Sequence, residues 1–221
     1  MKAIRKIIIL GAGGTSRDIV CVISEINKFL GNKYQCLGFL DDDKKLWGKN
    51  IMGLKILGPI NKALDFSDCV FINGVYSLKD YSLNQKVIKK SKIPISRFET
   101  IIHPSASIYE SSVISNGSLI MNNVTIMSNV NIGKHVIIQP NTVISHNSEI
   151  DDYTFVSNSV SIGGHVKIGK ACLIGLNSSI REQIRIGEHS IVGMGGVVLE
   201  DIPAKSVYVG NPAKFLKKTS L

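Results

Sequence analysis

An aliphatic residue recurs at every sixth position through the second half of the chain, without a break from Ile108 to Val198. A period of six matches neither the α-helix, which repeats about every 3.6 residues, nor the strand, which repeats about every 2. It suits a triangular solenoid in which one hexad forms each side and three hexads complete a coil. Glycine and asparagine between the hexads allow tight corners. The repeat therefore predicts a parallel β-helix.

The first half of the chain alternates strand-like and helix-like segments. A buried strand "KIIIL" leads into a glycine turn "GAGGTS", and an amphipathic helical pattern over 17–31 ends at Gly31. Strand patterns at 34–43 and 69–74 and a helical pattern at 82–92 continue the alternation. This order is typical of a small Rossmann-like parallel α/β domain. We place that domain at 1–100 and the β-helix at 101–221.

Charge is concentrated in the first domain. Residues 1–100 hold 17 Lys and Arg against 9 Asp and Glu, whereas residues 101–221 hold 9 against 8. The basic half should attract anions. The cluster "KVIKKSK" has no interleaved aromatic residues, which favours a solvated helix face over a nucleic-acid site.

The cysteines and the apolar runs indicate a protein of the cytoplasm. No apolar run is long enough to span a bilayer, and "KIIIL" is too short for a signal peptide. The four cysteines form no C-x-x-C pair and three lie in apolar runs, so we expect buried free thiols, with no disulfide and no zinc.

The unbroken hexads, with "SIGGHVKIGKACLIGLNSSI" and "IGEHSIVGMGGVVLEDIP", and the terminal "VGNPAK" resemble the left-handed β-helix acyltransferases. The N-terminal "IIILGAGGTS" and "GFLDDD" narrow the resemblance to the sugar-nucleotide N-acetyltransferases of bacterial surface-glycan pathways, whose sialic-acid O-acetyltransferase relatives share the layout. The resemblance implies a left-handed β-helix, a homotrimer, and transfer of an acetyl group from acetyl-CoA to a sugar amine. The implied acceptor is a 4-amino-4,6-dideoxy sugar on UDP or dTDP.

His146 is the candidate catalytic base. Positions eighteen residues apart should stack on successive coils, which puts Gly164 next to His146. Acyl transfer to an amine needs a base for the proton and a donor for the oxyanion, and an imidazole beside a glycine N–H supplies both. The resemblance assigns the same two roles. His165 is the rival base, and His135 and His189 are interpreted as surface residues of hexad turns.

Two positions depart from the family pattern. An acidic residue commonly follows the catalytic histidine, where this chain has Asn147. A histidine nine residues after the base often contacts the acetyl group, where this chain has Phe155. We expect a less assisted base. No two histidines have a close ligand spacing, so we expect no metal.

The resemblance also implies the residues that hold the two substrates. For acetyl-CoA it indicates Phe155, Gly164, Leu176 and Met194. For the nucleotide sugar, the glycine loop and the carboxylates after the second strand suit phosphate and ribose, and the candidates are Gly13, Gly14, Thr15, Asp41, Asp42 and Gly74.

Two alternatives remain open. The same base could act on a hydroxyl, as in O-acetylation of a sialic acid or a related sugar. A protein of another class, a nucleotide-binding scaffold without catalysis, is favoured only by Asn147 and Phe155.

Overall fold

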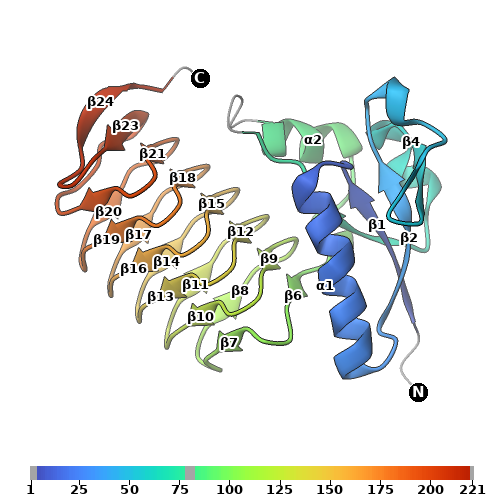
Figure 1. Ribbon diagram of the computed structural model, residues 1–221, viewed down its shortest axis with the longest axis horizontal. Coiled ribbons are helices and arrows are strands. Elements are labelled where there is room, and N and C mark those ends of the chain that lie inside the picture. The colour runs from blue at the N-terminus through green and yellow to red at the C-terminus, as the bar shows by residue number, and fades with distance from the viewer. Residues whose placement is uncertain (1–3, 78–82, 220–221) are drawn as a thin grey trace. The chain divides into compact units, whose positions relative to one another are not determined.

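The computed structural model describes residues 4–77 and 83–219, so Ser82 and the outer ends of the two predicted domains lie outside the described residues. Contacts divide the chain into two compact units, Met1–Pro104 and Ser105–Leu221. Figure 1 labels their elements. No helix of the described residues is long and apolar enough to cross a membrane.

Unit 1 is built on a sheet of order β3-β4-β2-β1-β5, in which only the β3–β4 pair is antiparallel. Its strands are β1 (Arg5–Leu10), β2 (Tyr34–Leu40), β3 (Asn50–Ile51), β4 (Leu54–Gly58) and β5 (Val70–Asn73). Its helices are α1 (Gly14–Leu30) and α2 (Leu83–Ser91), with short 3-10 turns η1 (Lys44–Leu46), η2 (Ile60–Asp65) and η3 (Ile95–Arg97). The strand β6 (Ile101–Ile102) follows η3. The predicted Rossmann-like α/β fold is confirmed.

The local sequence explains these elements. Four successive apolar residues of β1, Ile7 to Leu10, are fully buried, as expected for the inner strand of a parallel sheet. Helix α1 buries Ile19, Ile23 and Ile26, spaced three or four apart on one face. It begins at Gly14, earlier than predicted, because the last residues of the glycine turn already form its first turn.

Unit 2 is the predicted left-handed parallel β-helix. Its first sheet has the order β22-β19-β16-β13-β10-β7, with strands Val197–Val198, Ser179–Ile180, Ser161–Ile162, Val143–Ile144, Thr125–Ile126 and Ser107–Ile108. The second has the order β20-β17-β14-β11-β8, with strands Arg185–Ile186, Lys167–Ile168, Glu149–Ile150, Asn131–Ile132 and Val113–Ile114. The third contains β23-β21-β18-β15-β12-β9, with strands Ser206–Val209, Ile191–Val192, Leu173–Ile174, Phe155–Val156, Ile137–Ile138 and Leu119–Ile120. The strand β24 (Lys214–Lys218) pairs antiparallel with β23.

Side chains from two positions of each hexad fill the prism. The aliphatic residue of each hexad points inward, and Ile126, Ile144 and Ile162 are at most 2% exposed. Each such side chain contributes about 1.5–3 kcal/mol by burial. The small residue two positions earlier is also inside, where its hydroxyl joins coils: Ser148 Oγ donates to Gly163 O at 2.9 Å and accepts from Val166 N at 3.1 Å. The hydroxyls thus satisfy backbone groups that the corners leave unpaired.

The cysteines and His135 differ from the sequence expectation. Cys69 and Cys172 are buried, but Cys36 is half-buried and Cys21 is exposed because it lies on the outer face of α1. His135 is 2% exposed, not a surface residue. Its ring stacks on Tyr153 with centroids 5.4 Å apart, and burial lowers the pKa of His135 to about 4.

The burial of His135 predicts a loss of stability in mild acid. Its pKa is about 6.5 in an unfolded chain and about 4 when folded, so between these values the unfolded chain binds the extra proton. The free energy of unfolding should fall by up to about 3 kcal/mol over that range, with no further loss from this group at lower pH. Urea unfolding of the wild type and His135→Asn at several pH values tests this. The variant should lose less stability than the wild type, and equal losses would contradict the prediction.

Candidate active site

The strand register places His146 and Gly164 at the same corner of the prism, on successive coils. His146 lies in the turn from β13 to β14, and Gly164 lies in the turn from β16 to β17 one coil further on. Strand β13 pairs with β16, and β14 with β17, each with a shift of eighteen residues. The two turns therefore stack, as the hexad period predicts.

The ring of His146 covers Gly164. A Cβ atom built on Gly164 would lie 2.8 Å from Cε1 and 3.0 Å from Nε2 of His146, closer than any side chain allows. Glycine at this position is thus what lets the imidazole lie against the next coil. Gly164 is buried under this ring, and within the described residues its N–H donates to no acceptor.

Asn147 fixes the tautomer of His146. Its Oδ1 lies 3.3 Å from His146 Nδ1. An amide oxygen can only accept, so Nδ1 carries the hydrogen and Nε2 presents its lone pair. Asn147 has a φ of 59°, a left-handed conformation that asparagine tolerates better than most residues, and its N–H donates to Ser128 O at 3.0 Å. His146 itself is exposed, so a substrate can reach Nε2. An imidazole nitrogen that can accept a proton thus lies against a backbone N–H that has no partner among the described residues, and general acid–base catalysis uses groups of these two kinds.

A second imidazole lies against the first. The rings of His165 and His146 are 5.2 Å apart between centroids and inclined at 85°, an edge-to-face pair. From the sequence alone, His165 is expected only as an alternative base. The period places His165 above Asn147 rather than above His146, which is why the ring contact was not predicted.

The residues predicted for acetyl-CoA do not all lie at the His146 corner. Leu176 and Met194 stack in the turns β18–β19 and β21–β22, at a different corner of the prism, where they are 47% and 76% exposed. Phe155 points outward from β15 between Ile137 and Leu173 and is half-buried. Of the predicted set, only Gly164 shares the corner of His146.

In unit 1 the predicted nucleotide residues gather at the carboxyl ends of β1, β2 and β5. Gly13 caps α1, Gly14 and Thr15 begin the helix, and Gly13 and Gly14 are exposed. Asp41 holds this loop in place, because its Oδ2 accepts from Ala12 N and its Oδ1 accepts from Asp43 N, both at 2.8 Å. Asp41 was predicted to bind the nucleotide sugar together with this loop, and in the structure it braces the loop.

Asp42 and Gly74 have structural partners as well. Asp42 accepts from Ile60 N at 3.2 Å and forms an ion pair with Lys90 at 2.8 Å. A Cβ on Gly74 would meet Ser16 Oγ at 2.3 Å, so Gly74 makes room for the serine that stands where a dinucleotide motif has its third glycine. The buried Ser16 hydroxyl has no hydrogen-bond partner among the described residues.

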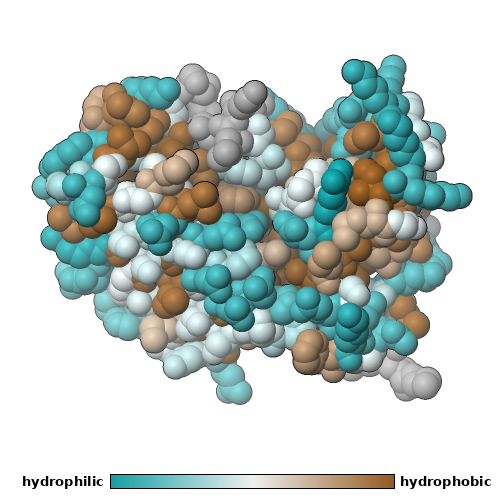
Figure 2. Space-filling view, in the orientation of Figure 1, coloured by the Kyte–Doolittle hydropathy of each residue, from teal (hydrophilic) through white to brown (hydrophobic). Residues whose placement is uncertain are grey.

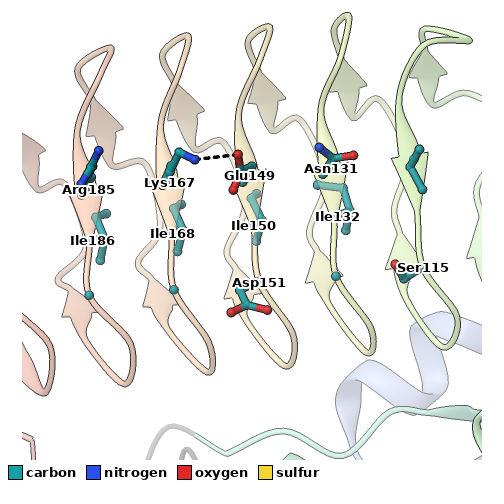
Figure 3. A pocket seen from close by; sticks show the side chains of 14 residues that line it. Ser115, Asn131, Ile132, Glu149, Ile150, Asp151, Lys167, Ile168, Arg185 and Ile186 are labelled. Atoms are coloured by element: carbon teal, nitrogen blue, oxygen red, sulfur yellow. Dashed lines mark hydrogen bonds and ion pairs between the residues drawn. The ribbon is translucent and has the colours of Figure 1, made fainter.

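A shallow groove follows the outer face of the second sheet. Figure 3 shows Asn131, Glu149, Lys167 and Arg185 in a row on successive coils, and Lys167 Nζ contacts Glu149 Oε1 at 2.8 Å. Both side chains of that pair are more than half exposed, so the pair adds about 0–1 kcal/mol of stability. His146 does not line this groove, and we assign no chemistry to it. No group of three or more His, Cys, Asp or Glu among the described residues could hold a metal ion.

Solved structures share the fold. The perosamine N-acetyltransferase of Caulobacter crescentus, a histidine mutant bound to CoA and GDP-perosamine, has a TM-score of 0.83 at 24% identity, covering 98% of this chain and 99% of that one. The acetyltransferase domain of PglB from Neisseria gonorrhoeae with acetyl coenzyme A has a TM-score of 0.82 at 24% identity, covering 97% and 100%. WeeI from Acinetobacter baumannii has a TM-score of 0.80 at 23% identity, covering 96% and 100%. At these identities the likeness concerns the fold, and it confirms the predicted fold of each unit.

Sequence relatives match over shorter stretches. A 2,3,4,5-tetrahydropyridine-2,6-dicarboxylate N-acetyltransferase of Staphylococcus aureus is 46% identical over 48 residues, which are 22% of this chain and 20% of that enzyme. The match thus spans about a fifth of the curated relative. The family model of the PglD N-terminal domain matches residues 6–77, and that of the GMPPB C-terminal domain matches residues 98–220, more than half of the chain. By that longer match, the chain belongs to the GMPPB C-terminal domain family.

Proposed function

We propose that this protein transfers an acetyl group from acetyl-CoA to the amine of a nucleotide-linked amino sugar. The observation that carries the proposal is the imidazole of His146 lying over Gly164, with neither Nε2 nor the glycine N–H hydrogen-bonded within the part of the chain that the structure describes. Similar folds bound to CoA, acetyl-CoA and GDP-perosamine support the choice of substrates.

The chemistry follows from these groups. As the amine attacks the thioester carbonyl, His146 Nε2 takes its proton, and the Gly164 N–H donates to the oxygen that becomes negative. Collapse of the tetrahedral intermediate breaks the C–S bond, releases CoA as the thiolate, and leaves the proton on His146 for transfer to sulfur or solvent. Burial raises the pKa of Cys172 to about 12, so this thiol stays protonated and is not a nucleophile.

The acetyl-CoA site should be shared between two chains. His146 with Gly164 and Leu176 with Met194 occupy different corners of the prism, so one extended ligand meets both sets where the corners of two copies adjoin. When two different surfaces of one chain contact each other and the contact repeats around an axis, the copies can form a closed ring. The family that the sequence resembles forms rings of three subunits, so we propose a homotrimer. Phe155 completes the predicted acetyl-CoA set.

Exposed apolar surface on unit 2 supports an assembly. In Figure 2 apolar residues gather over β23 and β24, where Phe215 and Leu216 are 53% and 57% exposed. With the exposed side chains of Leu176 and Met194, these residues give the C-terminal coils several exposed apolar side chains. Exposed apolar surface of this kind favours contact with another chain.

The nucleotide sugar is assigned to the glycine loop of unit 1. The exposed residues Gly13 and Gly14 form the N-terminus of α1, and Thr15 follows them. The N-terminus of a helix attracts the negative charge of a phosphate group. Asp41, Asp42 and Gly74 surround the loop as described above. We also propose a cytoplasmic location, since the exposed free thiol of Cys21 suits a reducing compartment.

The deciding experiment is a panel of UDP-, dTDP- and GDP-linked 4-amino sugars assayed for release of CoA from acetyl-CoA. Acetylation of one amine supports the proposal. A reaction only with the hydroxyl of free sialic acid would instead favour O-acetylation, and nucleotide binding without CoA release would favour a scaffold.

The first prediction concerns His146. His146→Ala should lower kcat by about two to four orders of magnitude with little change in either KM, because the base acts only in the transition state. The control is His189→Ala, since His189 lies at another corner. Steady-state kinetics measures both, and near-full activity of His146→Ala would contradict the mechanism.

The second prediction concerns Asp41. Asp41→Ala should raise KM for the nucleotide sugar about tenfold and leave KM for acetyl-CoA unchanged, because it releases Ala12 N and the glycine loop. Asp43→Ala is the matched control, with the same charge change next to the site. Equal effects on both substrates, or equal effects of both variants, would contradict the assignment.

The third prediction concerns shared sites. The variant His146→Ala and the double variant Leu176→Glu with Met194→Glu should each be inactive. Their coexpression should yield mixed trimers with about a quarter of wild-type activity. The reason is that in random assembly about a quarter of the sites combine an intact His146 corner from one chain with an intact Leu176 and Met194 corner from its neighbour. Mixing the two purified variants under conditions in which subunits do not exchange should give no activity. If coexpression also gives none, each site lies within one chain, and if the double variant is active, Leu176 and Met194 do not bind acetyl-CoA.

A further inference from the structure

His165 is fixed to the backbone of His146. It follows Gly164 in the turn from β16 to β17, and its N–H donates to the carbonyl oxygen of His146 at 3.0 Å. Its φ of 58° matches the 59° of Asn147, the residue one coil earlier in the same corner position. The two αL residues stack, so the backbone determines where the His165 side chain starts.

The His165 ring packs against one side of the His146 ring. With a centroid separation of 5.2 Å and an angle of 85°, the pair has the edge-to-face geometry that opposes the positive edge of one ring to the negative face of the other. The backbone of His165 is held by its left-handed conformation and by its hydrogen bond to the His146 carbonyl, and its side chain is exposed like that of His146.

His146 needs such a partner to stay in place. The side chain is exposed, and its hydrogen bond to Asn147 at 3.3 Å is longer than the usual 2.7–3.2 Å. Gly164 provides a flat surface under the ring but has no side chain to stop its rotation. Asn147 selects the tautomer, and a second contact must select the rotamer.

We propose that His165 is a positioning residue, which holds the imidazole of His146 in the orientation that presents Nε2 to the acceptor amine. The inference rests on the proposed function, in which His146 is the base. It needs the ring of His165 and not its proton, and this distinguishes positioning from a second base.

Two substitutions separate the ring from its proton. His165→Asn removes the ring but suits a left-handed conformation, whereas His165→Phe keeps a flat ring without a titratable group. The position tolerates rings, because Tyr153 and His135 adopt the same φ region in another corner. His189→Asn, at φ 57° in the same corner as those two, is the matched control for the backbone.

The asparagine variant should lower kcat about tenfold with both KM values within about twofold of wild type, since misorientation of a reacting group slows the step without weakening binding. The phenylalanine variant should restore kcat to within about twofold, and His189→Asn should change nothing. If His165→Phe is as slow as His165→Asn, His165 acts through its proton. Full activity of the asparagine variant, or a rise of either KM alone, would also overturn the proposal.

A spectroscopic readout makes the inference independent of turnover. Nuclear Overhauser effects between the His146 ring protons and the Gly164 Hα protons report whether the imidazole stays over the glycine. They should be strong in the wild type and His165→Phe, and weak in His165→Asn, because the ring then samples other rotamers. Equally strong effects in all three proteins would overturn the positioning role even for an active enzyme. Failure of the wild type to acetylate any amino sugar would overturn the proposed function but leave this result readable.

Discussion

The eighteen-residue register between successive coils is the constraint on which the rest of unit 2 depends. Each coil donates backbone hydrogen bonds to the next, such as Ser145 N to Ile162 O at 2.9 Å, while the inward aliphatic residues fix the phase of the coil. A slip of one residue would turn buried Ile144 and Ile162 outward and lose about 1.5–3 kcal/mol for each side chain moved. The same burial that stabilises the prism thus determines which corner residues become neighbours.

Catalytic chemistry in such a fold is confined to the corners and outer faces. Inside the prism the hexad leaves aliphatic side chains, small hydroxyls and the thiol of Cys172, but the second residue of each corner is free of the repeat. At one corner this freedom yields His146 on one coil and Gly164 on the next, and the absent Cβ of the glycine accommodates the imidazole. An imidazole and a backbone donor therefore come together without any loop having to fold over them, which would keep the reorganisation small in the proposed reaction.

How much was predictable from the sequence depends on whether a feature follows from the period. The β-helix and the stacking of Gly164 on His146 did, because both are consequences of periodic burial. The edge-to-face contact of His165 did not, since it depends on two side-chain rotamers and an αL backbone. The burial of His135 was missed for a related reason: the period identifies the inward positions, but it does not say which outward side chains are covered by their neighbours.

Asp41 illustrates how a predicted binding residue can also be structural. Two backbone amides, from Ala12 and Asp43, occupy one acceptor site on each carboxylate oxygen. A carboxylate has about four such sites, so about two remain for hydroxyl or base donors of a nucleotide. The bonds that brace the loop also fix the direction of these remaining sites, so a nucleotide at the proposed site would meet an acceptor that is already ordered. Bracing and binding are therefore compatible in one side chain, and bracing lowers the entropic cost of binding.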